Sequence, residues 1–382
     1  MNKLHSLQVI GKMDRGGAET LIMNLMRTES MSDVTFDFLV HSKNKADYDD
    51  EIIERGGHIW HIPRYVIANE PFYHKAVHEF FRKHHDFDVV HGHIESSAAI
   101  YLQEAKSRGI FTIAHSHSTN RPSVSPLEIA ERILHNRTRG IADYYLACSR
   151  QAGIDHFGTE ITGSNSFEVL KNGIDLPAYV FDSSTRKRVR NELGAGDKIV
   201  VCHVGRFVKQ KNHDFLLQSF KKFHEKNKNS CLWLVGRGPE EALTRERARA
   251  AGIKDAVRFL GVCSNIPQIL MASDIFVFPS LYEGLGIAAI EAQASGLPCL
   301  LSDQVPELTQ ITSDTYRLPL GCGTDAWAAK MDTMINCPNM RIPNSRSSAA
   351  EKVRKAGFDI NSSARQLHAL YENAAIATAR KA

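Results

Sequence analysis

The sequence has little of what membrane anchoring or export would need. No stretch approaches the ~20 consecutive apolar residues that span a bilayer, and the apolar run at the N-terminus is too short for a signal peptide. Paired cysteines are missing too, because the seven cysteines are widely spread and none forms a CxxC pair. A zinc ribbon or redox pair therefore has no support. These features predict a cytoplasmic protein, soluble or at most peripheral at the inner face of the cytoplasmic membrane.

Two common nucleotide-binding signatures are also absent. No segment matches GxGxxG, which argues against a nicotinamide or flavin dinucleotide, and none matches the GxxxxGK[ST] loop of P-loop NTPases. The net charge is small, +4 from 47 basic and 43 acidic residues. A charge of this size suits a phosphate-bearing ligand, but without a clustered basic stripe it does not indicate nucleic acid.

What the sequence does contain is a regular alternation of apolar patterns. The 382 residues, 43% hydrophobic and 24% charged, have an ordinary globular composition and enough length for two domains. Short apolar runs alternate with segments whose apolar residues recur every three or four positions, the pattern of an α/β fold with parallel sheets. The strands expected in the first half are 4–11, 36–42, 58–63, 87–93, 110–116 and 144–149.

A second series of strands begins near residue 198. Its expected strands are 198–205, 230–236, 257–261, 274–280 and 297–302, each followed by a polar loop or an amphipathic segment. Gly, Pro and Ser cluster around residues 171–184, so we place the join between the two series there. A last helical stretch, 362–382, follows the second series, and its periodicity does not indicate which domain it packs on.

Three loops follow the carboxyl ends of predicted strands, the edge where open α/β sheets bind ligands. The first contains Gly16 and Gly17, which let the backbone approach a ligand ahead of a helix N-terminus. The second runs from Gly205 and carries Arg206 and Lys211. Cations at a strand end suit the two phosphates of a nucleoside diphosphate. An ordinary glycine turn and a solvated basic turn are the alternatives.

The third loop is the most informative of the three. The buried strand 274–280 is followed by Glu283 and by a turn formed by Gly284, Leu285 and Gly286. An apolar helix that contains Glu291 begins after this turn. Free amides at the turn can hold a phosphate or a sugar hydroxyl. An idle carboxylate in an apolar helix would be costly, so Glu291 is interpreted as a clamp for the cis-diol of a ribose.

These residues resemble the E-x7-E signature of retaining nucleotide-sugar glycosyltransferases of family 4, in particular bacterial exopolysaccharide and capsule enzymes. The resemblance extends over nearly the whole chain in order. Its motifs are the early Gly-Gly loop, FDVVHGH, IAHSHS, KNGID, HVGRFVKQKN, LVGRGP, the E-x7-E element and SDQVPEL.

The resemblance implies a GT-B fold, two Rossmann-like domains facing across a cleft. Residues 1–172, joined by the returning helix 360–382, would hold the acceptor, and residues 173–359 the nucleotide-sugar donor. The donor would be a nucleoside-diphosphate sugar, with UDP favoured over GDP. No metal or other cofactor is required. The implied donor-binding residues are Gly16, Gly17, Gly205, Arg206, Lys211, Gly236, Glu283, Gly284, Leu285, Gly286 and Glu291.

The resemblance also assigns chemistry to some of these residues. Arg206 and Lys211 would stabilise the departing diphosphate, and Glu283 would touch the sugar or its phosphates. His115 or His117 would line the acceptor side and take part in catalysis, with His93 a further acceptor-side candidate. Each of these histidines has a purely structural alternative. The triplets Asp47-Tyr48-Asp49 and Asp86-Phe87-Asp88 are interpreted as structural rather than as metal-binding DxD motifs.

The expected function is transfer of a sugar to a glycan or lipid-linked acceptor in surface polysaccharide synthesis. Two alternatives remain: a nucleotide-sugar epimerase or hydrolase on the same fold, and a non-catalytic nucleotide-sugar-binding subunit. Residues 72–87 combine aromatic and basic side chains on one predicted helix. This helix is either a peripheral contact with an anionic membrane or an ordinary helix with a hydrated basic face.

Overall fold

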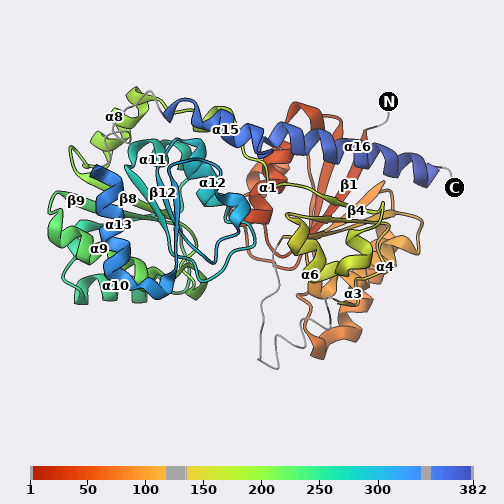
Figure 1. The fold of residues 1–382 in the computed structure, drawn as a ribbon. Coiled ribbons are helices and arrows are strands. Elements are labelled where there is room, and N and C mark those ends of the chain that lie inside the picture. The colour runs from red at the N-terminus through yellow and green to blue at the C-terminus, as the bar shows by residue number, and fades with distance from the viewer. Residues whose placement is uncertain (1–2, 118–133, 135, 337–345, 380–382) are drawn as a thin grey trace. The chain divides into compact units, whose positions relative to one another are not determined.

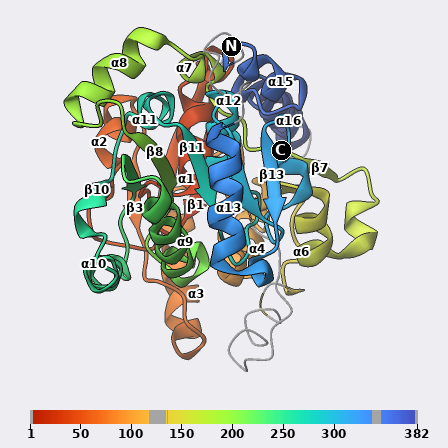
Figure 2. The ribbon, with the colours of Figure 1, turned by 60° about the vertical axis from the view of Figure 1, so that its left-hand side comes forward.

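The computed structural model describes residues 3–117, 134, 136–336 and 346–379. The chain divides into two compact units, coloured along the chain in Figures 1 and 2. The first unit comprises Met1–Ile174 and Ile360–Ala382, and the second comprises Asp175–Asp359. The expected boundary at 172/173 lies two residues before this division. Among the described residues, no helix is both long and apolar enough to cross a membrane.

The first unit is built on a seven-stranded parallel sheet in the order β3-β2-β1-β4-β5-β6-β7. Six strands were expected from their apolar runs, and the edge strand β7 was not. The strands are β1 (Leu4–Ile10), β2 (Val34–Val40), β3 (Ile59–His61), β4 (Val89–Gly92), β5 (Phe111–Ser116), β6 (Tyr144–Ala147) and β7 (Phe167–Val169).

Helices of the first unit pack their apolar stripes on this sheet. They are α1 (Gly17–Met26), α2 (Asp49–Glu54), α3 (Glu70–Lys83), α4 (Glu95–Lys106), α6 (Arg150–Thr162) and α16 (Ile360–Ala379). Figure 1 shows α16 alongside α1 and β1. Its buried residues recur at helical spacing, so one face of α16 completes the core of the first unit. That face consists of Ile360, Ala364, Leu367, Tyr371 and Ala374.

The second unit repeats the same plan. Its six-stranded parallel sheet has the order β10-β9-β8-β11-β12-β13, which matches the first sheet strand for strand apart from β7. The α/β architecture with two parallel sheets is therefore confirmed, and only the edge strand β13 was not expected. The strands are β8 (Ile199–Val204), β9 (Ser230–Val235), β10 (Val257–Gly261), β11 (Ile275–Phe278), β12 (Cys299–Ser302) and β13 (Thr315–Leu318).

The helices of the second unit lie around this sheet (Figure 2). They are α7 (Leu176–Tyr179), α8 (Ser183–Glu192), α9 (His213–Lys226), α10 (Glu241–Ala250), α11 (Ile266–Ala272), α12 (Ile287–Ala294), α13 (Gly323–Asn336) and α15 (Ala349–Lys355). Strands β8, β9, β11 and β12 are buried along nearly their whole length, as expected for a parallel sheet covered on both faces.

Candidate active site

In the second unit, the loops after β8 and β11 meet because these strands are neighbours in the sheet. The Leu281 amide donates to the Gln210 carbonyl (2.8 Å), and the Gln210 side chain donates to the Tyr282 carbonyl (3.0 Å). Asn212, with a left-handed φ of 55°, donates from its side chain to the Pro279 carbonyl over 3.2 Å. These three bonds fix the basic loop against the loop that begins the E-x7-E element.

The result is an ion pair between Lys211 and Glu283. Lys211 Nζ donates to Glu283 Oε1 over 2.6 Å, and only 15% and 7% of the two side chains are exposed. The same Nζ lies 4.7 Å from the centre of the Phe278 ring. Arg206 is exposed and forms no ion pair with any described residue. A ligand would thus meet the unpaired guanidinium of Arg206 and the ammonium of Lys211, which is already bonded to a carboxylate. The sequence did not predict the ion pair between Lys211 and Glu283.

Two of the predicted donor-binding glycines have a structural reason of their own. A Cβ at Gly236, whose φ is 135°, would lie 2.1 Å from the Gly205 carbonyl oxygen. A Cβ at Gly205 would in turn lie 3.2 Å from Cδ of Lys211. The loop after β9 therefore packs directly on the loop after β8, and the Lys211 side chain passes over Gly205. Gly236 therefore requires glycine even without a ligand, whereas a side chain at Gly205 would crowd the stem of Lys211.

The glycine turn before α12 leaves an amide-rich edge. Gly286 precedes the helix with a left-handed φ of 82°, and Leu285 is buried beneath the turn. The first amides of α12 lack acceptors within the helix, as at any helix start, and the helix dipole adds positive potential there. With Gly284 in the same turn, this edge can receive a negatively charged or hydroxyl-bearing group.

Glu291 projects from α12 toward α7. Its carboxyl accepts a hydrogen bond from the Tyr179 hydroxyl over 2.7 Å. Burial raises the pKa of Glu291 to about 7. One such bond uses only part of the capacity of a carboxyl group, so Glu291 can accept further hydroxyl donors. Tyr179 lies in the segment interpreted as the join between domains, and no residue pattern in the sequence marks it as a site residue.

In the first unit, the Gly16-Gly17 loop leads into α1. Gly16 precedes the helix and sits against the Glu19 side chain, while a Cβ at Gly17 would meet nothing within 4 Å. Asp47 accepts a hydrogen bond from the Arg15 amide (3.1 Å), and Asp49 accepts one from the Ala46 amide (2.7 Å). These two carboxylates of the first DxD-like triplet therefore hold local backbone in place.

Four histidines gather at the carboxyl ends of β4 and β5, and we call them the histidine cluster: His91, His93, His115 and His117. His91 Nε2 lies 3.1 Å from His115 Nδ1, and His93 Nδ1 lies 2.7 Å from His117 Nε2. Each pair of rings is tilted by only 16° or 29°, with ring centres 5.2 and 5.0 Å apart. The rings therefore meet edge to edge, as ring N–H donors and ring nitrogen acceptors do.

The histidine cluster is electrically neutral at neutral pH. Burial lowers the pKa of His91 to about 3 and that of His117 to about 4. Burial also holds the pKa of His93 and of His115 well below the usual range. Because none of the four rings carries a charge, each holds a single proton, on one of its two nitrogens.

The histidine cluster contains the one candidate metal-binding group among the described residues. Nitrogens of His91, His93 and His115 lie within 4.8 Å of one another. Those that face a neighbouring ring are occupied by the hydrogen bonds just described. The outer nitrogens of His91 and His93 are bonded to Tyr371 (2.7 Å) and Gln8 (2.9 Å). The contacts therefore describe a hydrogen-bonded set, and a metal would have to displace these bonds.

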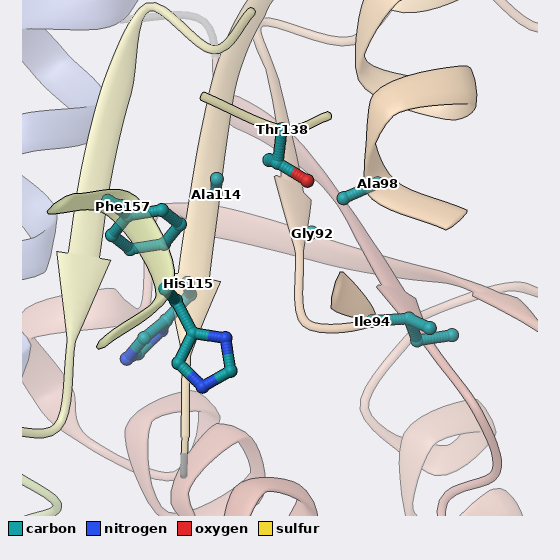
Figure 3. Close-up of a pocket in the computed structure, with 8 residues that line it drawn as sticks. Gly92, Ile94, Ala98, Ala114, His115, Thr138 and Phe157 are labelled. Carbon is teal, nitrogen blue, oxygen red and sulfur yellow. The ribbon is translucent and has the colours of Figure 1, made fainter. Parts of the chain in front are cut away.

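His115 lines a very small cavity, shown in Figure 3 with Gly92, Ile94, Ala98, Ala114, Thr138 and Phe157. The cavity has a volume of about 10 Å³, room for about one water molecule and far too little for a sugar ring. His115 itself is only 2% exposed. His117 and His93 are half-buried at the strand ends. The two histidines that the sequence left as alternatives thus have different surroundings.

Comparisons with known proteins agree with this arrangement. The family description "Glycosyltransferase Family 4" matches residues 15–177, and "Glycosyl transferases group 1" matches residues 185–356. EpsF of Bacillus subtilis (strain 168), whose name places it among the glycosyltransferases, is 34% identical over 310 residues, 79% of each chain.

Two other relatives carry more detailed names. The UDP-Gal:alpha-D-GlcNAc-diphosphoundecaprenol alpha-1,3-galactosyltransferase of Escherichia coli is 29% identical over 242 residues, 58% of this chain and 59% of its own. A GDP-mannose-dependent alpha-(1-6)-phosphatidylinositol monomannoside mannosyltransferase of Mycolicibacterium smegmatis is 25% identical over 339 residues, 85% of this chain and 87% of its own.

Solved structures show the same fold. HepE of Anabaena, solved with UDP-glucose, superposes with a TM-score of 0.78 at 17% identity, covering 96% of this chain and 98% of its own. WaaG, a glycosyltransferase involved in lipopolysaccharide biosynthesis, gives a TM-score of 0.71 at 14% identity over 97% and 98%. The fold and the family matches define a glycosyltransferase of the GT-B class. Within that class, the chain belongs to glycosyltransferase family 4.

Proposed function

We propose that the second unit binds a nucleoside-diphosphate sugar and that the enzyme transfers its sugar, with retention of configuration, to a glycan or lipid-linked acceptor. The observation that carries this proposal is the meeting of Lys211, Glu283 and the amide-rich start of α12 at one edge of the sheet. Arg206 adds an unpaired cation at the same strand end. Two cations and free amides suit a diphosphate.

In this proposal the donor rearranges an existing ion pair. The diphosphate competes with Glu283 for the Lys211 ammonium, which lies 2.6 Å from that carboxylate. Glu283, released in part from Lys211, then accepts hydrogen bonds from sugar hydroxyls. As the bond between sugar and phosphate breaks, negative charge grows on the diphosphate, and Lys211 with Arg206 stabilises it more strongly than in the ground state.

Glu291 holds the ribose of the donor in the same proposal. Its carboxyl already accepts a hydroxyl from Tyr179 over 2.7 Å, and the two hydroxyls of a ribose are donors of the same kind. In the ionised form, a carboxylate accepts such bonds with roughly twice the strength of a neutral acceptor. Tyr179 fixes the carboxyl orientation before the nucleotide arrives.

We favour a UDP-sugar over a GDP-sugar as the donor and a lipid-linked glycan as the acceptor. The name of the Escherichia coli relative specifies UDP-Gal and a diphosphoundecaprenol-linked acceptor, and HepE was solved with UDP-glucose. The Mycolicibacterium relative is instead named as GDP-mannose-dependent. For retention, Glu283 and Glu291 both have ligand-binding tasks, so attack on the donor's own face, assisted by the departing diphosphate, is the proposed route.

A transfer assay tests the proposal. The full chain is incubated with UDP- or GDP-sugars and lipid-diphosphate-linked sugars, and proton NMR reads the anomeric configuration of the product. We expect transfer from a UDP-sugar with the donor's configuration kept, and an added ~2.7 kcal/mol of stability at a donor concentration of 100 times Kd. An inverted product would contradict retention. Donor turnover without an acceptor would favour an epimerase or hydrolase, and stabilisation without turnover a binding subunit.

The start of α3 supports a membrane-proximal position at the cytoplasmic face. Val66, Ile67 and Phe72 are 49%, 58% and 74% exposed, and the side chain of Lys75, one turn further on, is exposed as well. Exposed apolar side chains beside a lysine suit the interface of an anionic bilayer. Arg82, at the other end of α3, is paired with Glu79 over 3.0 Å, and we therefore propose that the N-terminal end of α3 makes the contact.

Vesicle sedimentation tests this contact. We expect the protein to sediment with vesicles of phosphatidylcholine and phosphatidylglycerol, and the double variant Phe72→Ser with Lys75→Glu to bind about tenfold less, because burying a phenylalanine contributes about 1.5–3 kcal/mol. Ile376→Ser is the matched control, since Ile376 is 52% exposed on α16. Equal sedimentation of the double variant and the wild type would remove the proposal.

A further inference from the structure

A chain of hydrogen bonds connects the histidine cluster to Ser6 on β1. In each of these bonds, the donor and the acceptor can be assigned. Ser6 Oγ donates to the Thr35 carbonyl over 3.1 Å, and this carbonyl can only accept. A hydroxyl has one proton, so when that proton goes to Thr35, Ser6 Oγ can only accept from its other neighbours. These are the Gln8 side chain at 3.2 Å and the Tyr371 hydroxyl. The amide nitrogen of Gln8, not its oxygen, therefore faces Ser6.

The orientation of Gln8 decides what its other neighbours do. Gln8 Nε2 also donates to the Tyr371 hydroxyl over 3.0 Å. Tyr371 then uses its own proton to donate to His91 Nδ1, 2.7 Å away. On the other side, Gln8 Oε1 accepts from His93 Nε2 over 2.9 Å. The Gln8 amide thus begins two hydrogen-bond chains. It is the donor at the start of the chain through Tyr371 and the acceptor at the start of the chain through His93.

A neutral imidazole ring has one donor nitrogen and one acceptor nitrogen, so the role of one nitrogen determines the role of the other. His91 accepts at Nδ1, so its proton is on Nε2, which donates to His115 Nδ1 over 3.1 Å. His93 donates from Nε2, so its Nδ1 accepts from His117 Nε2 over 2.7 Å. The open ends are then a protonated His115 Nε2 and an unprotonated His117 Nδ1. Both atoms are buried from solvent, and neither has a hydrogen-bond partner among the described residues.

We propose that Ser6 and Gln8, with Tyr371 of α16, are positioning residues that hold all four histidines in the Nε2–H tautomer, so that His117 presents an unprotonated Nδ1 to a ligand hydroxyl. His115 lines the cavity of about 10 Å³, which is too small for a sugar ring. The ligand class, a sugar hydroxyl, rests on the proposed function. The assignment of the four tautomers is independent of that function.

Histidine ring NMR on the full chain measures this directly. In histidine-labelled protein, long-range proton–nitrogen correlations report which ring nitrogen carries the proton, and single His→Gln variants assign the signals. We expect all four rings as Nε2–H at pH 7. In Gln8→Glu, the carboxylate accepts from Tyr371, which then accepts from His91. His91 and His115 should switch to Nδ1–H, while His93 and His117 keep Nε2–H.

A second variant and a control keep the test decisive. Tyr371→Phe should move only the His91 Nδ1 signal downfield, because that nitrogen loses its donor, and should leave His93 and His117 unchanged. Tyr101→Phe, which removes another buried hydroxyl bonded to the Ile94 carbonyl at 2.9 Å, should change none of the four. An Nδ1–H tautomer at any of the four wild-type rings overturns the proposal. So does an unchanged His91 signal in Tyr371→Phe.

The ligand step is read separately. Saturation with a sugar nucleotide or acceptor that stabilises the protein against heat should move the His117 Nδ1 signal upfield and leave His115 in place. Movement of His115 alone would overturn the assignment of His117. If no sugar nucleotide or acceptor stabilises the protein, the proposed function fails, while the tautomers measured in the free protein still stand or fall on their own.

Discussion

Replacing Lys211 with methionine should lower kcat/KM for sugar transfer by about 100- to 1000-fold, the loss typical of removing one group that stabilises transition-state charge. Lys211 is 15% exposed and its ammonium lies 2.6 Å from Glu283, so its charge is fixed where the proposal puts the diphosphate. Methionine keeps most of the length and the apolar character of the lysine stem and removes the ammonium group with its charge and its three donors. Steady-state kinetics with saturating acceptor measure the effect.

Two further variants separate chemistry from folding. Lys211→Met leaves Glu283 buried without its cation, and breaking such a pair costs about 3–5 kcal/mol. The double variant with Glu283→Gln should recover most of this stability in urea unfolding yet stay as inactive as the single variant. Lys209→Ala, an exposed lysine of the same loop, should lose less than threefold. Activity within tenfold of the wild type in Lys211→Met would refute the assigned role.

Replacing Glu291 with glutamine should weaken binding of the nucleoside diphosphate by about 10- to 100-fold at pH 8, because hydrogen bonds to a charged acceptor contribute about 1.5–3 kcal/mol. In the wild type, affinity should rise as the pH is raised from 6 to 8, because the pKa of Glu291 is about 7 and the ionised carboxylate is the better acceptor. Glutamine does not ionise, so its affinity should be flat over this range. Calorimetric titration with a UDP-sugar measures both, because a UDP-sugar, unlike UDP, has no terminal phosphate that ionises near pH 6.

Stability without nucleotide should show the opposite dependence on pH. The folded protein holds the Glu291 proton up to a pKa of about 7, whereas the unfolded chain releases it near 4.5. Between these values the folded state binds more protons, so stability falls as the pH rises from 4.5 to 7, by on the order of 3 kcal/mol, and then levels off. Glu291→Gln should remove this component. The same slope in wild type and variant would show that Glu291 does not titrate there.

The sequence predicted the fold well where apolar runs are long and buried. Eleven strands were expected, and each coincides with an observed strand. The two missed strands, β7 and β13, are four residues or shorter and form sheet edges. Edge strands carry polar side chains such as Glu168 and Arg317, which break the apolar pattern that identified the others.

The candidate site was predictable at the level of positions but not of partners. Loops after parallel strands converge on one sheet edge, so the neighbourhood of Lys211 and Glu283 follows from topology. Their direct pairing depends on side-chain packing that no motif encodes. Tyr371 illustrates the limit, since it contacts Gln8 across 363 positions of sequence. His91 could have been found, because an HxH pair on each of two adjacent strands points both side chains to one face.

The return of α16 to the first unit has a consequence for biosynthesis. The ribosome must make all of Asp175–Asp359 before the residues that complete the first core emerge. At 5–20 residues per second, that interval is roughly 10 to 40 seconds. During this time, Gln8 and His91 lack the hydroxyl of Tyr371, and the apolar groove for α16 is uncovered. The first unit to be synthesised is therefore the last to finish folding, and nascent chains stalled before residue 360 should bind chaperones through that groove.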